Sequence, residues 1–152
     1  MIKKILFFVF AAFFAATAGF CVSVSQEETE FMPIQKAFRE KSFESLKVQA
    51  ARFIQDHPQS KYRGAAELLL GQAYFHLNDF QGAARTFESA SEKPAQESLR
   101  EEALYWAAEA HFKAKDYPAA VKYYTEVIEK YPTSRFLIYS KYSKAWSLYE
   151  LE

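Results

Sequence analysis

Cysteine, glycine and proline are scarce in this chain of 152 residues, which has one cysteine, four glycines and five prolines. A single cysteine cannot form a disulfide within the chain, so the fold must be stable without that crosslink. Few glycines and prolines disfavour a loop-rich β-sandwich and favour long helices. These absences predict a helical globular protein.

Net charge and catalytic motifs are also missing. The 19 basic and 19 acidic side chains cancel, so no overall field attracts nucleic acid or an anionic surface. The sequence contains no glycine-rich phosphate loop, no G-x-S-x-G elbow, no H-E-x-x-H and no cysteine pair. The three histidines lie apart, and we expect structural roles for them. We therefore expect no enzymatic activity, no cofactor, no metal site and no nucleic-acid partner.

Hydrophobic and aromatic residues are abundant, at 50% and 18% of the chain. The first residues, MIKKILFFVFAAFFAATAG, have two lysines, an apolar run and then small residues, which is the layout of a secretory signal peptide. We expect residues 1–25 to be a signal peptide or an N-terminal membrane anchor and residues 27–152 to form the folded domain. The folded part should then lie outside the cytoplasm, in the periplasm or cell envelope.

Cys21 leaves three interpretations of this segment open. Cleavage after Ala18 would leave Gly19 first in the mature chain and keep Cys21 near its start, and Ser23-Val24-Ser25 is a second possible cleavage site. Lipidation of Cys21 would anchor the protein as a bacterial lipoprotein is anchored, although Phe20 precedes it where a small residue is preferred. An uncleaved apolar segment would span the membrane and still place the domain outside. Membrane contact is expected only through this segment.

The sequence repeats itself with a period of 37 residues. A second strong copy follows the first, with a weaker copy before them and a partial copy after them. The predicted repeats are 27–60, 64–97, 101–134 and 138–152. Five pairs of residues show the match: Phe75 and Phe112, Asp79 and Asp116, Phe80 and Tyr117, Ala83 and Ala120, and Phe87 and Tyr124.

Each copy reads as two helices joined by a short polar turn. Asp79 and Asp116 stand where they can cap the second helix, and Pro118 falls in a first helical turn, where proline is tolerated. Apolar residues recur at helical spacing in both halves. A small residue followed four positions later by an aromatic one would let the two helices approach closely. The sequence predicts helical hairpins.

The repeats resemble the tetratricopeptide repeat, whose signature runs L-G-x-x-Y, then A-x-x-x-F, then P. Leu70-Gly71-x-x-Tyr74 and Ala83-x-x-x-Phe87 carry the resemblance, as do Ala120-x-x-x-Tyr124 and Pro132. It implies an all-α fold, an α-α solenoid of about three hairpins plus a terminal helix, acting as a protein-binding scaffold. The copies depart from the tetratricopeptide signature in three ways. Their period is 37 residues, and His111 replaces a tyrosine. In the first copy Leu46 and Ala50 stand at the alanine and aromatic positions.

Two repeats end in HPQS and YPTS. Such endings behind a signal peptide resemble BamD-like outer-membrane assembly lipoproteins and YbgF (CpoB)-like partners of the Tol-Pal system. This resemblance implies that the partners are other envelope proteins or peptide segments, with a role in outer-membrane assembly or cell division.

In tetratricopeptide proteins the first helix of each hairpin lines a concave face that contacts ligand. By register, the resemblance assigns three rows of residues to that face: Phe31, Leu68, Tyr105 and Tyr142; Gln35, Gln72, Glu109 and Trp146; and Phe38, Phe75, Phe112 and Tyr149. A rotation of the register by one residue, about 100° on a helix, would instead place these aromatic side chains in the core. Both interpretations stand at this point.

The last segment, 138–152, is apolar where a solenoid end is normally polar. Its apolar side chains are Ile138, Tyr139, Tyr142, Trp146, Leu148 and Leu151. We expect this helix to contact a partner, a second copy of the chain in a homodimer, or residues missing because the sequence is a fragment. A purely structural, oligomerising module is the alternative to a binding scaffold.

Overall fold

The computed structural model describes residues 26–92 and 97–152. In these ranges the chain forms seven helices and no strand, which confirms the all-α prediction. The leader or anchor expected at residues 1–25, including Cys21, lies outside the described residues. The helices are α2 (Gln26–Arg39), α3 (Phe43–Asp56), α4 (Arg63–His76), α5 (Phe80–Glu92), α6 (Glu97–Lys113), α7 (Tyr117–Lys130) and α8 (Leu137–Tyr149).

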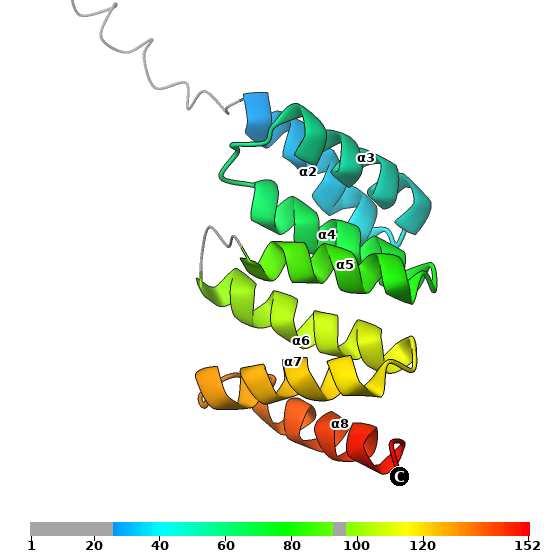
Figure 1. Cartoon of the computed structure of the whole chain (residues 1–152). Helices are drawn as coiled ribbons and strands as arrows, with labels where there is room; N and C mark the ends of the chain where they lie inside the picture. The colour runs from blue at the N-terminus through cyan, green and yellow to red at the C-terminus, as the bar shows by residue number, and fades with distance from the viewer. Residues whose placement is uncertain (1–25, 93–96) are drawn as a thin grey trace, which may run out of the picture.

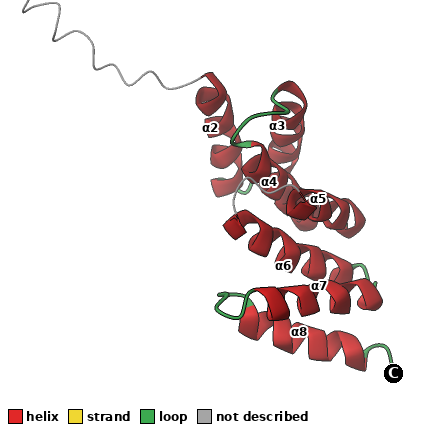
Figure 2. Ribbon diagram, turned by 60° about the vertical axis from the view of Figure 1, so that its left-hand side comes forward, coloured by secondary structure: helices red, strands yellow, loops and turns green. Residues whose placement is uncertain are grey.

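The helices stack in one direction, from α2 and α3 at one end to α8 at the other (Figure 1). Each helix contacts its neighbours in the sequence, and α2, α4, α6 and α8 also contact one another in turn. The turned view shows the same progression of hairpins (Figure 2). The arrangement is the predicted α-α solenoid, and α2–α3, α4–α5 and α6–α7 are its hairpins.

The three hairpin turns share one backbone conformation. Lys41, Asn78 and Lys115 each adopt a left-handed conformation, with φ of 55°, 62° and 62°. At the central turn the Asp79 amide donates to the Tyr74 carbonyl at 2.9 Å and the Asn78 amide to the Phe75 carbonyl at 3.1 Å. This Schellman pattern satisfies the last carbonyls of the first helix. The 37-residue repeat is therefore also a repeat of backbone geometry.

Aspartates cap two of the second helices, as predicted. The Gly82 amide donates to Asp79 Oδ1 at 2.8 Å, and the Ala119 amide donates to Asp116 Oδ1 at 3.3 Å. Pro118 lies in the first turn of α7, where its missing N–H is not needed. These contacts fix where α5 and α7 begin.

Within each hairpin a small residue on one helix faces a larger one on the other. A Cβ built on Gly71 would lie 2.5 Å from the ring of Phe87, so that ring fills the space beside the glycine. Ala108 and Tyr124 share a buried cluster in the third hairpin. In the first hairpin the sizes are reversed, because Ile34 on α2 packs in one cluster with Ala50 on α3.

The segments HPQS and YPTS form the same turn between hairpins. The Ser60 hydroxyl donates to Glu27 at 2.7 Å and accepts from the Tyr62 amide at 3.1 Å. Two repeat lengths further on, the Ser134 hydroxyl donates to Glu101 and accepts from the Phe136 amide. Each serine therefore ties the start of one hairpin to the start of the next.

Of the helices in the described ranges, none combines the length and apolar character needed to cross a bilayer.

Candidate protein-binding surface

The first predicted row lies mostly between hairpins. Phe31 stacks on Tyr62 with ring centroids 5.0 Å apart and an interplanar angle of 14°. Tyr105 stacks in the same way on Phe136, at 4.4 Å and 13°. Leu68 is buried in the cluster that also contacts Leu99. These three positions hold successive hairpins together, so their side chains lie in the core rather than in an open groove.

The second row is divided between surface and interior. Gln35 is exposed, whereas Gln72 is buried. Glu109 is half-buried and accepts from the Tyr124 hydroxyl at 2.7 Å and from the Ser143 hydroxyl at 3.3 Å. Burial and the nearby Glu109 carboxylate raise the pKa of Tyr124 far above its usual value. Glu109 therefore bonds α6 to both α7 and α8.

Side chains of the third row pack against aromatic rings beside the hairpin turns. Phe75 meets the ring of Phe80 edge-on at 5.4 Å, and Phe112 meets Tyr117 edge-on at 5.7 Å. Both Phe75 and Phe112 are half-buried, while Phe38, in the first hairpin, is 37% exposed. The twelve predicted residues therefore do not form one continuous exposed surface, because neighbouring units cover most of the central ones.

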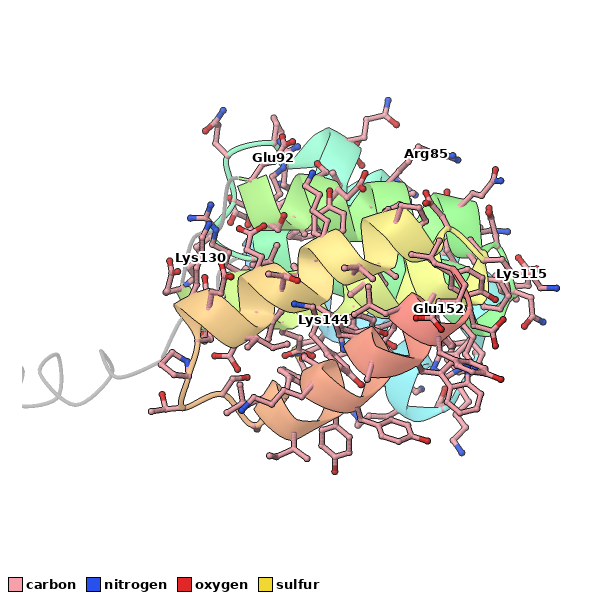
Figure 3. All side chains as sticks on the ribbon, turned by 60° about the horizontal axis from the view of Figure 1, so that its bottom comes forward. Arg85, Glu92, Lys115, Lys130, Lys144 and Glu152 are labelled. Carbon is pink, nitrogen blue, oxygen red and sulfur yellow. The ribbon has the colours of Figure 1, made fainter. Side chains whose placement is uncertain are left out.

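Helix α8 is different, because its aromatic side chains face outward. It packs on α7 and on α6, and Ser140 and Ser147 are its fully buried residues. These serines take the register positions of Ala103 and Ala110 in α6, which are also fully buried. Lys144 is half-buried on the side near α7 (Figure 3). Small side chains thus let α8 approach α7, and the large ones remain on its other side.

Four residues of α8 line a shallow hollow on its outer side: Tyr142, Ala145, Trp146 and Tyr149. We call these four residues the α8 face. Tyr142, Tyr149 and Trp146 are 70%, 68% and 47% exposed, and the rings of Trp146 and Tyr149 lie 5.9 Å apart. Ala145 was not among the predicted site residues, although its register with Gly71 and Ala108 marks it as a packing position.

Several of the described titratable groups make contacts between helices. His111 Nε2 lies 2.8 Å from Glu88 Oε1, and His111 Nδ1 lies 3.2 Å from Asp116 Oδ2. The Tyr123 hydroxyl donates to the same Glu88 oxygen at 2.9 Å, and its pKa is raised by burial and then by this contact. Within the described residues, no group of three or more histidine, cysteine or acidic side chains is placed to hold a metal ion.

Comparison with known families gives one result that agrees with this geometry. A family model described as tetratricopeptide repeat matches residues 68–135, a segment that runs from α4 through α7. No curated protein matches the chain. Tetratricopeptide repeats are stacked helical units that act as protein-interaction scaffolds. Residues 68–135 therefore match the tetratricopeptide repeat in sequence, and the stacked helices α4 to α7 agree with that match.

Proposed function

We propose that the chain is a protein-binding scaffold that contacts its partner through the α8 face and catalyses no reaction. The observation that carries this proposal is the exposure of Tyr142, Trp146 and Tyr149 together on one helix. Tyrosine and tryptophan are enriched at the energetic centres of protein interfaces, and contiguous exposed apolar patches mark interaction sites. The matched family supports the same general role.

Absence of catalysis is part of the proposal. It is supported by the missing sequence motifs and by the use of His111, Glu88 and Asp116 in contacts between helices. An enzyme would need such groups to converge on an open site. Partner binding needs only an exposed apolar surface whose burial against the partner is favourable in free energy.

We also propose that the domain works in a bacterial envelope, with envelope proteins in outer-membrane assembly or the Tol-Pal system as partners. The support is the layout of residues 1–25 and the HPQS and YPTS endings. Mass spectrometry of the mature N-terminus would test the export step. A new terminus at Gly19 supports cleavage, a diacylglyceryl adduct on Cys21 supports a lipid anchor, and an intact Met1 with cytoplasmic fractionation contradicts export.

Photo-crosslinking in intact cells tests the binding role. A photoreactive phenylalanine analogue at Tyr149 should give adducts with another protein, and Trp146→Ala should reduce them. The matched control position is Val48, which is apolar and 64% exposed on α3. Equal adducts from Val48, or none from Tyr149, would contradict a binding role for the α8 face.

The alternative function is oligomerisation, in which two copies pair through the same face. The exposed aromatic side chains of α8 favour it as well. Crosslinked homodimers at Tyr149, together with a concentration-dependent dimer in sedimentation, would favour this alternative over the scaffold.

A further inference from the structure

A pocket with a volume of about 360 Å³ lies among α3, α4 and α5, at the other end of the solenoid from α8 (Figure 1). Leu70 and Tyr74 of α4, Gly82 and Thr86 of α5, and Ile54 of α3 are among the residues that line it. We call this space the α4–α5 pocket. Its volume falls in the range of sites that bind small molecules.

The third hairpin shows what fills the corresponding space one repeat later. Thr86 corresponds in register to Tyr123, and Tyr74 corresponds to His111. The Tyr123 ring stacks on the His111 ring with centroids 5.4 Å apart and an interplanar angle of 10°. Because threonine has no ring, the equivalent space beside Tyr74 stays open in the second hairpin. The α4–α5 pocket therefore has the shape to accept a planar ring from outside the chain.

The ring that fits this space is apolar. The Tyr123 hydroxyl donates to Glu88 of α5 at 2.9 Å, but Ala51 takes the register position of Glu88 in α3 and offers no side-chain acceptor. Ile54 stands where the next unit has Ser91, so the α3 side of the pocket is more apolar. A phenyl ring therefore suits the α4–α5 pocket better than a phenol.

A buried carboxylate lines the same pocket. Glu67 is 7% exposed, whereas its register position in α6 is Leu104, which is 2% exposed. An aliphatic side chain therefore satisfies packing at this position, and burial of a carboxylate costs free energy even when it is paired. Arg63 Nε donates to Glu67 Oε1 at 3.0 Å, and Arg63 Nη1 donates to the Pro58 carbonyl at 2.9 Å. This arrangement leaves Glu67 Oε2 for an ammonium group.

Arg85 supplies a positive charge at the edge of the pocket. Its side chain is exposed and projects outward from α5 (Figure 3), and it makes no hydrogen bond or ion pair with the other described residues. A free guanidinium binds a carboxylate through strong, paired hydrogen bonds. Asp79 also lines the pocket, but its Oδ1 is engaged as the cap of α5.

We propose that the α4–α5 pocket binds a small zwitterionic molecule, an aromatic α-amino acid with an apolar ring. The ring stacks on Tyr74 in the space beside Thr86, the ammonium group binds Glu67, and the carboxylate binds Arg85. The site uses no residue of the α8 face. The inference therefore goes beyond the scaffold function, and either one can fail without the other.

Calorimetric titration of the full-length protein with L-phenylalanine tests the inference. We expect saturable binding at one site per chain, with a dissociation constant below about 1 mM. Phenethylamine, which lacks the carboxylate, and 3-phenylpropionate, which lacks the ammonium group, should each bind about tenfold more weakly or worse. An absence of saturable binding, or equal affinity for L-phenylalanine and 3-phenylpropionate, overturns the inference.

Variants of the pocket assign the binding to it. Thr86→Tyr supplies the ring of the third hairpin from within the chain and should abolish binding of L-phenylalanine. Glu67→Leu, which copies Leu104 of α6, should abolish binding without lowering the thermal midpoint. Arg85→Gln should reduce the affinity for L-phenylalanine about tenfold and leave that for phenethylamine unchanged. The matched control is Lys122→Gln, an exposed base in the register position of Arg85 on α7, which should change neither affinity.

The remaining outcomes separate this site from other occupants. Binding that survives Thr86→Tyr, or a Glu67→Leu protein that binds as well as wild type, overturns the inference. A photoreactive phenylalanine analogue at Ser89, which also lines the pocket, should give no protein adduct. An adduct with another protein that L-phenylalanine does not displace would assign the pocket to a partner's side chain and also overturn the inference. Crosslinks from Tyr149 would then still support the scaffold.

Discussion

Gly71 has no side chain, and the ring of Phe87 fills the space beside it. Such size pairs decide how closely the helices of a hairpin approach, because protein interiors are packed as densely as organic crystals. The same principle explains the serines under α8, which are fully buried where α6 has alanines. At this scale, one methyl group is enough to change the fit.

Gly71→Ala should lower the free energy of unfolding by about 1–3 kcal/mol, as overpacked cores do. The new Cβ would lie 2.5 Å from the Phe87 ring, and this clash outweighs the gain in helix propensity of about 1 kcal/mol. Denaturant unfolding measures the change. Gly64→Ala is the matched control, because its Cβ would meet only Leu99 Cδ1 at 3.3 Å. A Gly71→Ala protein as stable as wild type would contradict this account.

Buried tyrosines make the stability sensitive to alkaline pH. Burial is the largest cause that raises the pKa of Tyr105, Tyr123 and Tyr124, with the Glu109 or Glu88 carboxylate next. Tyr131, which donates to Glu97, has a pKa raised to about 12, chiefly by burial. Since these pKa values are higher in the folded state, the unfolded chain loses its protons first as pH rises. Stability should therefore fall above the unfolded tyrosine pKa of about 10.

Tyr124→Phe tests this linkage. At neutral pH it should cost about 1–2 kcal/mol, because Glu109 loses a hydrogen-bond donor. Above pH 10 the decline should be shallower than in wild type, because one buried hydroxyl no longer titrates. Urea unfolding between pH 7 and about 11.5 measures both effects. An unchanged alkaline slope would show that Tyr124 does not contribute to the linkage.

At the scale of the element, the hairpin turns set the repeat. Each turn places one non-glycine residue in the left-handed region, at Lys41, Asn78 or Lys115. This conformation costs an ordinary residue about 1–2 kcal/mol, whereas asparagine tolerates it better. The turn persists because the Schellman hydrogen bonds and the aspartate caps on either side hold the two helices together.

Lys115→Gly should stabilise the protein by up to about 1 kcal/mol, since relief of the left-handed conformation exceeds the added entropy of the unfolded chain. Asn78→Gly should give a smaller gain at the equivalent turn. Shifts of the urea midpoint at constant slope measure both effects. A larger gain from Asn78→Gly than from Lys115→Gly would contradict the proposed origin of the strain.

At the scale of the molecule, the hairpins form a row in which each unit contacts only its neighbours (Figure 1). Stability in such an array depends on the units and the interfaces between them. The interior helices α4 to α7 have hairpins or helices on both sides. Helix α8 is covered by α7 and the edge of α6, and α2 and α3 meet only α4 beyond their own hairpin.

The rate of amide hydrogen exchange should be higher in the less covered helix α8 than in the interior helix α6. Amides in the middle of α8 should exchange at least about tenfold faster than those in the middle of α6, because local opening of an end unit exposes less buried surface. Exchange of the whole chain, followed by mass spectrometry of peptides, measures the difference. Slower exchange in α8 than in α6 would contradict an end unit of low stability.

The sequence alone determined the repeat and its local parts. The spacing of apolar residues predicted the hairpins. Asp79 and Asp116 were correctly expected to cap the second helices. Ala83 and Phe87 indicated where two helices approach closely, and both are fully buried. These features depend on contacts within a few turns of helix, and the residues concerned lie near one another in the chain. Local chemistry was sufficient for them.

Only the tertiary structure decided which aromatic residues are core and which are surface. Tyr105 and Tyr142 occupy the same register position, yet Tyr105 stacks on Phe136 of the next unit and Tyr142 is 70% exposed. The difference between them is whether a following unit lies beside the ring. Periodicity assigns a side chain to one face of its helix, but the packing of neighbouring units decides whether that face is covered.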